Sequence, residues 1–144
     1  RGASGIDGLL ATAAALAHGQ FDYVVAVIGD TSLLHDINSL SLLSKSPLPV
    51  KLLVLNNDGG QIFATLAAAQ QEGFNALFAM PHGLEFSHAC AQFSLEYRAV
   101  HTTEEFQGQC KAWLNSANSS VLECRLLGGA EPLKHLVQRL SEPL

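Results

Sequence analysis

Two apolar runs that end in polar residues constrain the fold of this chain most strongly. Residues 24–28 are followed by Gly29-Asp30, and residues 52–55 are followed by Asn56-Asn57-Asp58-Gly59. Apolar runs of this length, bounded by such residues, are typical of buried strands. Between the runs, apolar side chains recur at helical spacing, at Leu33, Leu34, Ile37, Leu40 and Leu43. The pattern predicts strand, helix and strand, joined by a right-handed crossover that makes the two strands parallel.

The polar residues after the two strands are expected to meet. Parallel strands joined in this way have their carboxyl ends at the same edge of the sheet, and neighbouring strands lie about 4.8 Å apart. If the strands are neighbours, the carboxylate of Asp30 and the amide oxygen of Asn57 can bind one hard cation, and oxygen ligands favour Mg²⁺. Asp30 alone could instead favour the start of the next helix through its charge. The spacing of 27 residues to Asn57 favours the metal.

The rest of the chain alternates helices and strands, which predicts an α/β fold with a doubly wound, mostly parallel sheet and helices on both faces. An irregular, partly helical excursion over residues 64–85 is broken at Met80-Pro81-His82-Gly83. The remaining strands are expected at 97–100 and 121–126. The remaining helices are expected at 9–17, 86–93, 103–114, with Thr103 as N-cap, and 131–140.

Composition excludes several classes of protein. Hydrophobic residues make up 48% and charged residues 15%, as expected for a sheet covered on both faces with some apolar surface left for a partner. The net charge of -5 argues against nucleic-acid binding, and no apolar run approaches the length of a membrane span. Three widely spaced cysteines form neither a zinc pattern nor a disulfide framework, so we expect free thiols and a cytoplasmic location.

The motifs resemble those of a known superfamily. Gly29-Asp30 followed by Asn56-Asn57 resembles the cofactor motif of thiamine-diphosphate (ThDP) enzymes. Two longer segments are similar to the SEPHCHC synthase family, the ThDP enzymes of menaquinone biosynthesis: residues 1–10, RGASGIDGLL, and residues 56–63, NNDGGQIF. The similarity runs from residue 1 to about residue 63 and is looser beyond.

The resemblance implies a domain organisation and a reaction. Residues 1–144 would be the diphosphate- and metal-binding domain, a C-terminal fragment of a larger, three-domain homo-oligomeric enzyme. That enzyme decarboxylates 2-oxoglutarate on ThDP and adds the product to isochorismate. Its catalytic glutamate comes from the N-terminal domain of a neighbouring subunit, so no catalytic residue is assigned in this chain. The fragment alone is expected to be inactive.

The resemblance also implies ligands for the metal and the cofactor. Mg²⁺, or Mn²⁺ in its place, would be bound by the Asp30 carboxylate, the Asn57 side-chain oxygen and the backbone carbonyl of Gly59. Cofactor-binding residues would be Ser4, Ile6, Gly29, Asp30, Thr31, Ser32, Asn57, Gly59, Gln61 and Ile62. Substrate-binding residues would be Arg1, Ile62 and Phe63.

Several of these residues have ordinary interpretations as well. Ser32 could be the N-cap of the next helix. Ile6 would prop ThDP in its bent form, but it could equally be the first core residue of the helix at 9–17. Ile62 and Phe63 could also be core residues.

Three alternatives stay open, and one of them is a noncatalytic interaction fragment. Another ThDP carboligase, such as an acetolactate-synthase-like protein, would share Asp30 and Asn57 but should lack the signature of residues 1–8. A noncatalytic, anion-binding α/β domain could use Asp30 as a phospho-acceptor. Such a domain should show a cluster of acids at the first strand and a lysine at a later strand end, and neither is evident.

Overall fold

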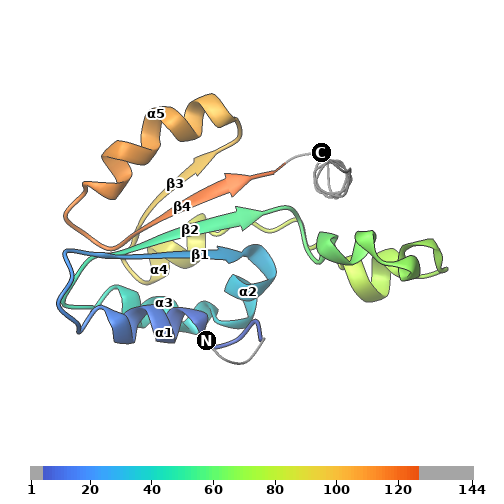
Figure 1. Ribbon diagram of the computed structural model, residues 1–144, viewed down its shortest axis with the longest axis horizontal. Coiled ribbons are helices and arrows are strands. Elements are labelled where there is room, and N and C mark those ends of the chain that lie inside the picture. The colour runs from blue at the N-terminus through green and yellow to red at the C-terminus, as the bar shows by residue number, and fades with distance from the viewer. Residues whose placement is uncertain (1–4, 127–144) are drawn as a thin grey trace, which may run out of the picture. The chain divides into compact units, whose positions relative to one another are not determined.

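Four parallel strands form one sheet in the order β1-β2-β4-β3 (Figure 1). The computed structural model describes residues 5–126. The strands are β1 (Val24–Gly29), β2 (Val50–Asn56), β3 (Glu96–Val100) and β4 (Ser120–Arg125). All of their pairings are parallel, and β1 and β2 are immediate neighbours. The predicted strands and their parallel arrangement are confirmed, with bounds shifted by one or two residues.

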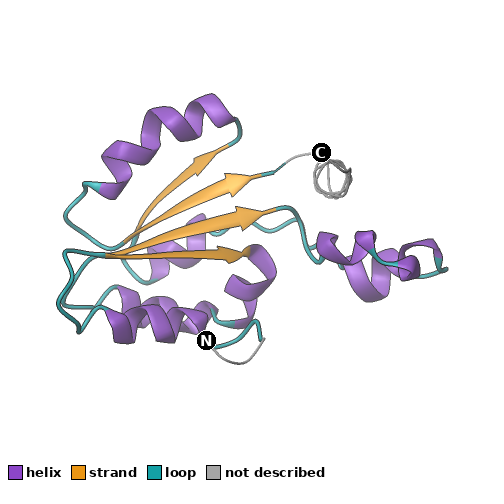
Figure 2. Cartoon of the chain, viewed as in Figure 1, coloured by secondary structure: helices purple, strands orange, loops and turns teal. Residues whose placement is uncertain are grey.

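Helices lie on both faces of the sheet, as predicted (Figure 2). One face is covered by α1 (Leu9–Leu16), α2 (Asp30–His35), α3 (Leu40–Leu43) and α4 (Ser87–Gln92), and the other by α5 (Thr103–Leu114). The core of the first face includes Leu10, Leu33, Leu52 and Val54. The core of the second face consists of Val100, Trp113, Leu122 and Cys124.

The α5 face is covered over β3 and β4, where α5 makes its sheet contacts. Over the other two strands, the side chains of Val25, Val27 and Leu55 are exposed. Part of the expected free apolar surface therefore lies, among the described residues, on this face of β1 and β2.

The crossover between β1 and β2 is not the single helix that the leucine spacing predicts. It is divided into α2, a 3₁₀ turn (Ile37–Ser39) and α3. At the break, the Asp36 carboxylate accepts hydrogen bonds from the Ser39 hydroxyl (2.7 Å) and from the backbone N–H of Leu10 (2.7 Å). Leu10 is near the start of α1, where backbone N–H groups lack partners within the helix. Asp36 therefore lies at the break between α2 and α3 and accepts a hydrogen bond from the first turn of α1.

The N-cap of α5 is Thr102, so the prediction of Thr103 was wrong. The hydroxyl of Thr102 accepts a hydrogen bond from the backbone N–H of Glu105 (3.1 Å), and the Glu105 carboxylate accepts one from the backbone N–H of His101 (2.7 Å). A threonine followed three residues later by a glutamate is the signature of a capping box. Phe106 follows Thr103 at that spacing and cannot accept such a bond.

Residues 57–84 form a second compact unit, separate from the sheet unit of residues 5–56 and 85–125. They contain two 3₁₀ segments, η2 (Gln61–Thr65) and η3 (Ala67–Gln70), and a π-helical turn, η4 (Asn75–Ala79). The turn ends at Met80, which has a positive φ of 44°. The prediction of an irregular, partly helical excursion with a break at this point is confirmed.

The predicted helix at 131–140 lies outside the described residues. Within residues 5–126, no helix has both the length and the apolar character needed to cross a membrane. The cysteines are free thiols on two helices and a strand, as predicted: Cys90 on α4, Cys110 on α5 and Cys124 on β4.

Candidate functional site

Asp30 lies at the carboxyl edge of the sheet, directly after β1. In the parallel register Gly29 is opposite Leu55, so β1 and β2 end at nearly the same level. Asp30 is the first residue of α2, and its side chain is buried, with 2% of the residue exposed. Its Oδ1 accepts a hydrogen bond from the backbone N–H of Thr31 (2.8 Å). A buried carboxylate at this edge needs compensating polar or cationic groups.

Gly29 precedes the carboxylate and leaves open space in front of the strand end. A Cβ built on Gly29 would have no non-neighbouring heavy atom within 4 Å. Gly29 is also the N-cap of α2, with an extended backbone. Ser32 is the third residue of α2, so its interpretation as an N-cap was wrong, although Thr31 and Ser32 do lie in the first turn, as predicted. Gly29 therefore leaves the position of its missing side chain open at the end of β1.

In the second unit, the residues after β2 form a tight turn. Asp58 and Gly59 both have positive φ, of 63° and 105°. A Cβ on Gly59 would lie 2.2 Å from the carbonyl oxygen of Ala79, which is too close for any side chain. Position 59 therefore requires glycine, both for its backbone conformation and for its packing. This explains the glycine in the motif independently of any ligand.

Asp58 organises this turn, and the sequence analysis missed it. Its Oδ1 accepts hydrogen bonds from the backbone N–H groups of His82 (2.9 Å) and Gly83 (2.7 Å). The side-chain amide of Gln61 donates to the carbonyl oxygen of Asp58 (3.2 Å). The signal was the Asn-Asp-Gly sequence, because an aspartate before a glycine often accepts local backbone hydrogen bonds in turns. Asp58 thus links the turn after β2 to the break that follows η4.

The potential metal ligands are hard oxygen donors. Among the described residues, no three histidine, cysteine, aspartate or glutamate side chains come together to hold a metal. A cation would therefore need amide and carbonyl oxygens beside a carboxylate, which is the predicted set of Asp30, Asn57 and the Gly59 carbonyl. Such a set suits Mg²⁺. Asp30 belongs to the sheet unit and the other two residues to the second unit, so their convergence on one ion stays a prediction.

The apolar candidates are exposed rather than packed in a core. Ile6 is 42% exposed, Ile62 62% and Phe63 41%. Phe63 makes an edge-to-face contact with Phe78 at a centroid distance of 6.4 Å. The interpretation of these three residues as core residues was therefore wrong, and each has surface available for a ligand. Arg1 and Ser4, the other predicted contacts in the first segment, lie outside the described residues.

A buried carboxylate lies behind the strand ends, and the sequence analysis also missed this one. Glu123 of β4 is fully buried. It accepts hydrogen bonds from the Asn56 side-chain amide (2.7 Å), the Tyr97 hydroxyl (2.6 Å) and the backbone N–H of Phe86 (3.3 Å). Burial raises the pKa of Tyr97, and the hydrogen bond to Glu123 raises it further. Burial, with a smaller effect of Glu123, raises the pKa of the Cys90 thiol to about 12.

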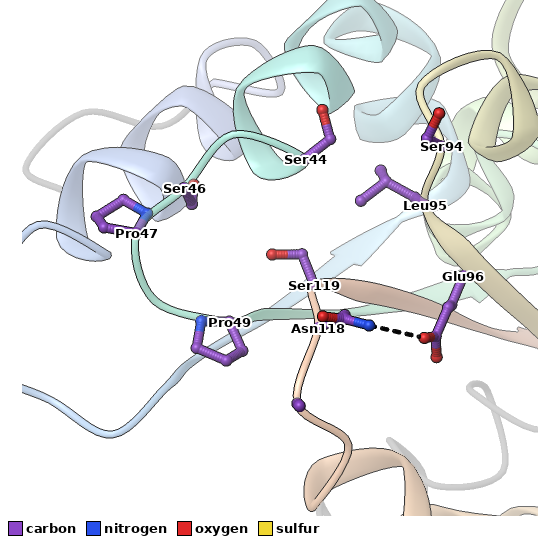
Figure 3. A pocket seen from close by; sticks show the side chains of 10 residues that line it. Ser44, Ser46, Pro47, Pro49, Ser94, Leu95, Glu96, Asn118 and Ser119 are labelled. Atoms are coloured by element: carbon purple, nitrogen blue, oxygen red, sulfur yellow. Dashed lines mark hydrogen bonds between the residues drawn. The ribbon is translucent and has the colours of Figure 1, made fainter.

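The amino edge of the sheet has its own polar features. Lys51 is fully buried, and its ammonium group donates to the carbonyl oxygens of Ser116 (2.8 Å) and Asn118. Burial lowers the pKa of Lys51, while the Glu96 carboxylate acts in the opposite direction. A cavity of about 400 Å³ is lined there by serines and prolines, together with Glu96 and Asn118, which share a hydrogen bond of 3.2 Å (Figure 3).

No residue predicted for the site lines this cavity. Two of its serine hydroxyls donate to backbone carbonyls of their own helix or turn: Ser44 to Ser41 (3.1 Å) and Ser46 to Leu42 (2.9 Å). In open α/β sheets ligands bind at the carboxyl ends of the strands. The carboxyl edge is therefore the candidate site.

Comparison with known proteins identifies the family of the chain. The chain matches, over residues 2–124, the family described as "Thiamine pyrophosphate enzyme, C-terminal TPP binding domain". It is 43% identical over 129 residues, 90% of the chain, to 2-succinyl-5-enolpyruvyl-6-hydroxy-3-cyclohexene-1-carboxylate synthase of Photobacterium profundum. It is 40% identical over 144 residues, 99% of the chain, to the synthase of the same name from Serratia proteamaculans. The chain spans 22% and 26% of the lengths of these two relatives.

Solved structures show the same fold at lower identity. Benzoylformate decarboxylase from Polynucleobacter necessarius is 20% identical with a TM-score of 0.69, covering 81% of this chain and 23% of its own. A thiamine diphosphate-dependent 4-hydroxybenzoylformate decarboxylase of Rhodococcus jostii is 24% identical with a TM-score of 0.61. The match covers 72% of this chain and 20% of the decarboxylase chain. The fold, the motifs at the carboxyl edge and the match over residues 2–124 lead to one conclusion. This chain belongs to the thiamine pyrophosphate enzyme family, as a C-terminal TPP-binding domain.

Proposed function

We propose that this chain is the diphosphate- and metal-binding part of a 2-succinyl-5-enolpyruvyl-6-hydroxy-3-cyclohexene-1-carboxylate (SEPHCHC) synthase. The observation that carries the proposal is the identity of 40–43% over 90–99% of the chain to two synthases of that name. The whole enzyme would decarboxylate 2-oxoglutarate and add the resulting fragment to isochorismate. Identity at this level, spread along the chain, favours this reaction over that of a more distant ThDP carboligase.

Asp30, Asn57 and the Gly59 carbonyl would hold Mg²⁺, or Mn²⁺ in its place. Two observations support this set. Asp30 is a buried carboxylate at a strand end, and the parallel register brings β1 and β2 to the same level. In this role the cation would neutralise the diphosphate in a protein that itself carries a net charge of -5. Without the cation, the Asp30 carboxylate would repel the diphosphate.

Other residues would bind the diphosphate and the organic part of the cofactor. Gly29 and the first turn of α2, with Thr31 and Ser32, would bind the diphosphate. Gln61, which follows the turn after β2, would also contact the cofactor. Ile6, exposed before α1, would support the bent cofactor. Ser4, which lies outside the described residues, would also contact it. ThDP, when bound, supplies the electron sink for decarboxylation of a 2-oxo acid. This chain's own contribution is to bind and orient it.

Ile62 and Phe63 would border the substrate, because they are exposed apolar residues directly after the metal turn. Arg1 would bind a substrate carboxylate, since a guanidinium pairs with it bidentately. The remaining length of the relatives would supply an N-terminal domain, from a second subunit, with the catalytic glutamate. We therefore expect residues 1–144 alone to have no turnover, and we retain a cytoplasmic location as a prediction.

The experiment is an assay of the full-length protein with ThDP and Mg²⁺. Incubation with 2-oxoglutarate and isochorismate should consume isochorismate and yield one product of the expected mass, detected by mass spectrometry. Pyruvate in place of 2-oxoglutarate should give much less product. Formation of acetolactate from pyruvate, with isochorismate left intact, would instead establish the acetolactate-synthase-like alternative. Absence of ThDP binding would favour a noncatalytic domain.

A further inference from the structure

We propose that Glu123 is a positioning residue for the metal and the diphosphate, acting through the two points where residues 57–84 leave and rejoin the sheet unit. The inference rests on the proposed function for its link to the cofactor. Its structural basis lies entirely within the sheet unit. Glu123 is not offered as a catalytic residue, because its side chain is fully buried.

The donors to Glu123 come from three separate segments. Asn56, the last residue of β2, donates its side-chain amide to Oε1 at 2.7 Å. Phe86, just before α4, donates its backbone N–H to Oε2 at 3.3 Å, and Tyr97 of β3 donates its hydroxyl to the same oxygen at 2.6 Å. One carboxylate thus joins residues that lie 67, 37 and 26 positions away in the sequence.

Two of these donors flank the second unit. Asn56 directly precedes Asn57, where the second unit begins, and Phe86 follows Leu84, where the excursion ends, by two residues. Glu85, which lies between Leu84 and Phe86, forms an ion pair with Arg125, two residues after Glu123 on β4. Arg125 Nε also lies 3.7 Å from Glu123 Oε1. The exit and the return of the excursion are therefore both held to the end of one strand.

A carboxylate in this place needs an explanation beyond stability. Burying a charge is costly, and a well-packed apolar side chain of similar size often stabilises a fold equally well or better. The other inward-facing residue of β4 on this face, Val121, is apolar and fully buried, as expected for a core position. Glu123 differs from it by accepting bonds from the residue before a predicted metal ligand. The Glu123 carboxylate therefore fixes the position of Asn56, and through it the position at which Asn57 leaves β2.

The test compares wild-type full-length protein with Glu123→Gln. Glutamine keeps the shape but replaces one acceptor oxygen by a donor, so it cannot accept from Asn56, Phe86 and Tyr97 together. Calorimetric titration with Mg²⁺ and ThDP should show affinity lower by roughly 10–100-fold, the usual effect of removing support behind a metal ligand. In the variant without cofactor, hydrogen exchange should accelerate relative to wild type in residues 57–84, and this acceleration should be larger than any in α5.

Val121→Ala is the matched control, because it removes buried atoms from the same strand and face. It should lower the melting temperature but leave both the ThDP affinity and the exchange of residues 57–84 unchanged. If Glu123→Gln does not fold, Asn56→Ala removes one donor while keeping the carboxylate, and the same two changes are expected. Wild-type affinity and exchange in the variant, or equal effects in Val121→Ala, would overturn the proposal.

The exchange measurement separates this proposal from the proposed function. If the wild-type protein binds no ThDP, the proposed function fails and the link to the cofactor fails with it. Exchange in residues 57–84 then still decides whether Glu123 holds the excursion. If the wild type binds ThDP and the variant binds it equally well, the proposed function stands and the positioning role is rejected.

Discussion

Within residues 5–126, the charged side chains of Lys51, near the amino edge of the sheet, and Glu123, toward the carboxyl edge, are fully buried, but they bind different parts of the chain. Lys51, near the amino edge, donates to groups that all belong to residues 116–120, the connection from α5 into β4. Glu123, toward the carboxyl edge, accepts from β2, from β3 and from the residue before α4. The lysine closes one loop, whereas the glutamate joins three segments.

This difference teaches where burial of a charge points to function. A buried lysine that satisfies the backbone of a single connection has a complete structural explanation, because unpaired carbonyl oxygens in the interior are costly. At the carboxyl edge, Asn56 donates to Glu123 and directly precedes Asn57, a predicted metal ligand. We therefore expect changes at the amino edge to affect folding alone, and changes at the carboxyl ends of β1 and β2 to affect cofactor binding.

The largest effect is expected from Asp30→Ala in the full-length protein. Removing the only carboxylate of the predicted metal set should weaken Mg²⁺-dependent ThDP binding by more than about 100-fold, because the effect of a ligand should exceed the roughly 10–100-fold of its supporting residues. Calorimetry measures the affinity. Asp22→Ala is the control, since Asp22 is exposed just before the same strand, at the amino edge. Wild-type affinity in Asp30→Ala would disprove the metal assignment.

Lys51→Met should lower stability without changing cofactor binding. The carbonyl oxygens of Ser116 and Asn118 would lose their donor, which should lower the free energy of unfolding by about 1–3 kcal/mol. ThDP affinity should not change. Urea unfolding and calorimetry of the same samples measure the two quantities, with Lys45→Met, at an exposed lysine, as control. A loss of affinity larger than the loss of stability explains would remove the distinction between the edges.

Tyr97→Phe tests the Glu123 network through pH. The pKa of Tyr97 is raised in the folded protein above its ordinary value of 10.0, so the neutral hydroxyl contributes stability that is fully present below about pH 10. This contribution is lost as the pH rises toward the folded value, because the unfolded tyrosine ionises first. The stability difference between wild type and variant, about 1 kcal/mol at neutral pH, should shrink above pH 10.

Melting curves at several pH values measure this difference. Tyr23→Phe, at an exposed position, should leave the curves unchanged. A difference between wild type and Tyr97→Phe that stays constant from pH 8 to pH 11 would contradict the role given to the hydrogen bond with Glu123.

The smallest effect is expected from Thr102→Ala, which removes the N-cap of α5. The free energy of unfolding should fall by about 0.5–2 kcal/mol. Thr103→Ala, one residue on, should cost less, because the Thr103 side chain is not the cap. Both residues follow β3 at the carboxyl edge, so unchanged ThDP affinity in both would show that this edge is functional at β1 and β2 and structural at β3.

Local patterns account for much of what could be predicted. The apolar runs before Asp30 and Asn57, with helical spacing between them, were sufficient to predict two parallel strands, because a right-handed crossover admits few alternatives. That the two strands are neighbours came from the structure. The spacing of Thr102 and Glu105 also predicts a capping box, and it would have given the correct N-cap in place of Thr103. The exposure of Ile6 and Ile62 was not legible, since an isoleucine next to a helix start fits either a core or a ligand.

The sequence by itself determined the fold class, the family and the edge of the sheet at which the candidate site lies, since these depend on periodicity and short motifs. Only the tertiary structure decided which polar groups from distant parts of the sequence bind one another. Asp36 caps Leu10 across 26 residues, and Glu123 binds Asn56 across 67. Such partners are chosen by how the strands and helices pack, because a hydrogen bond needs its atoms within about 3 Å whatever their separation along the chain.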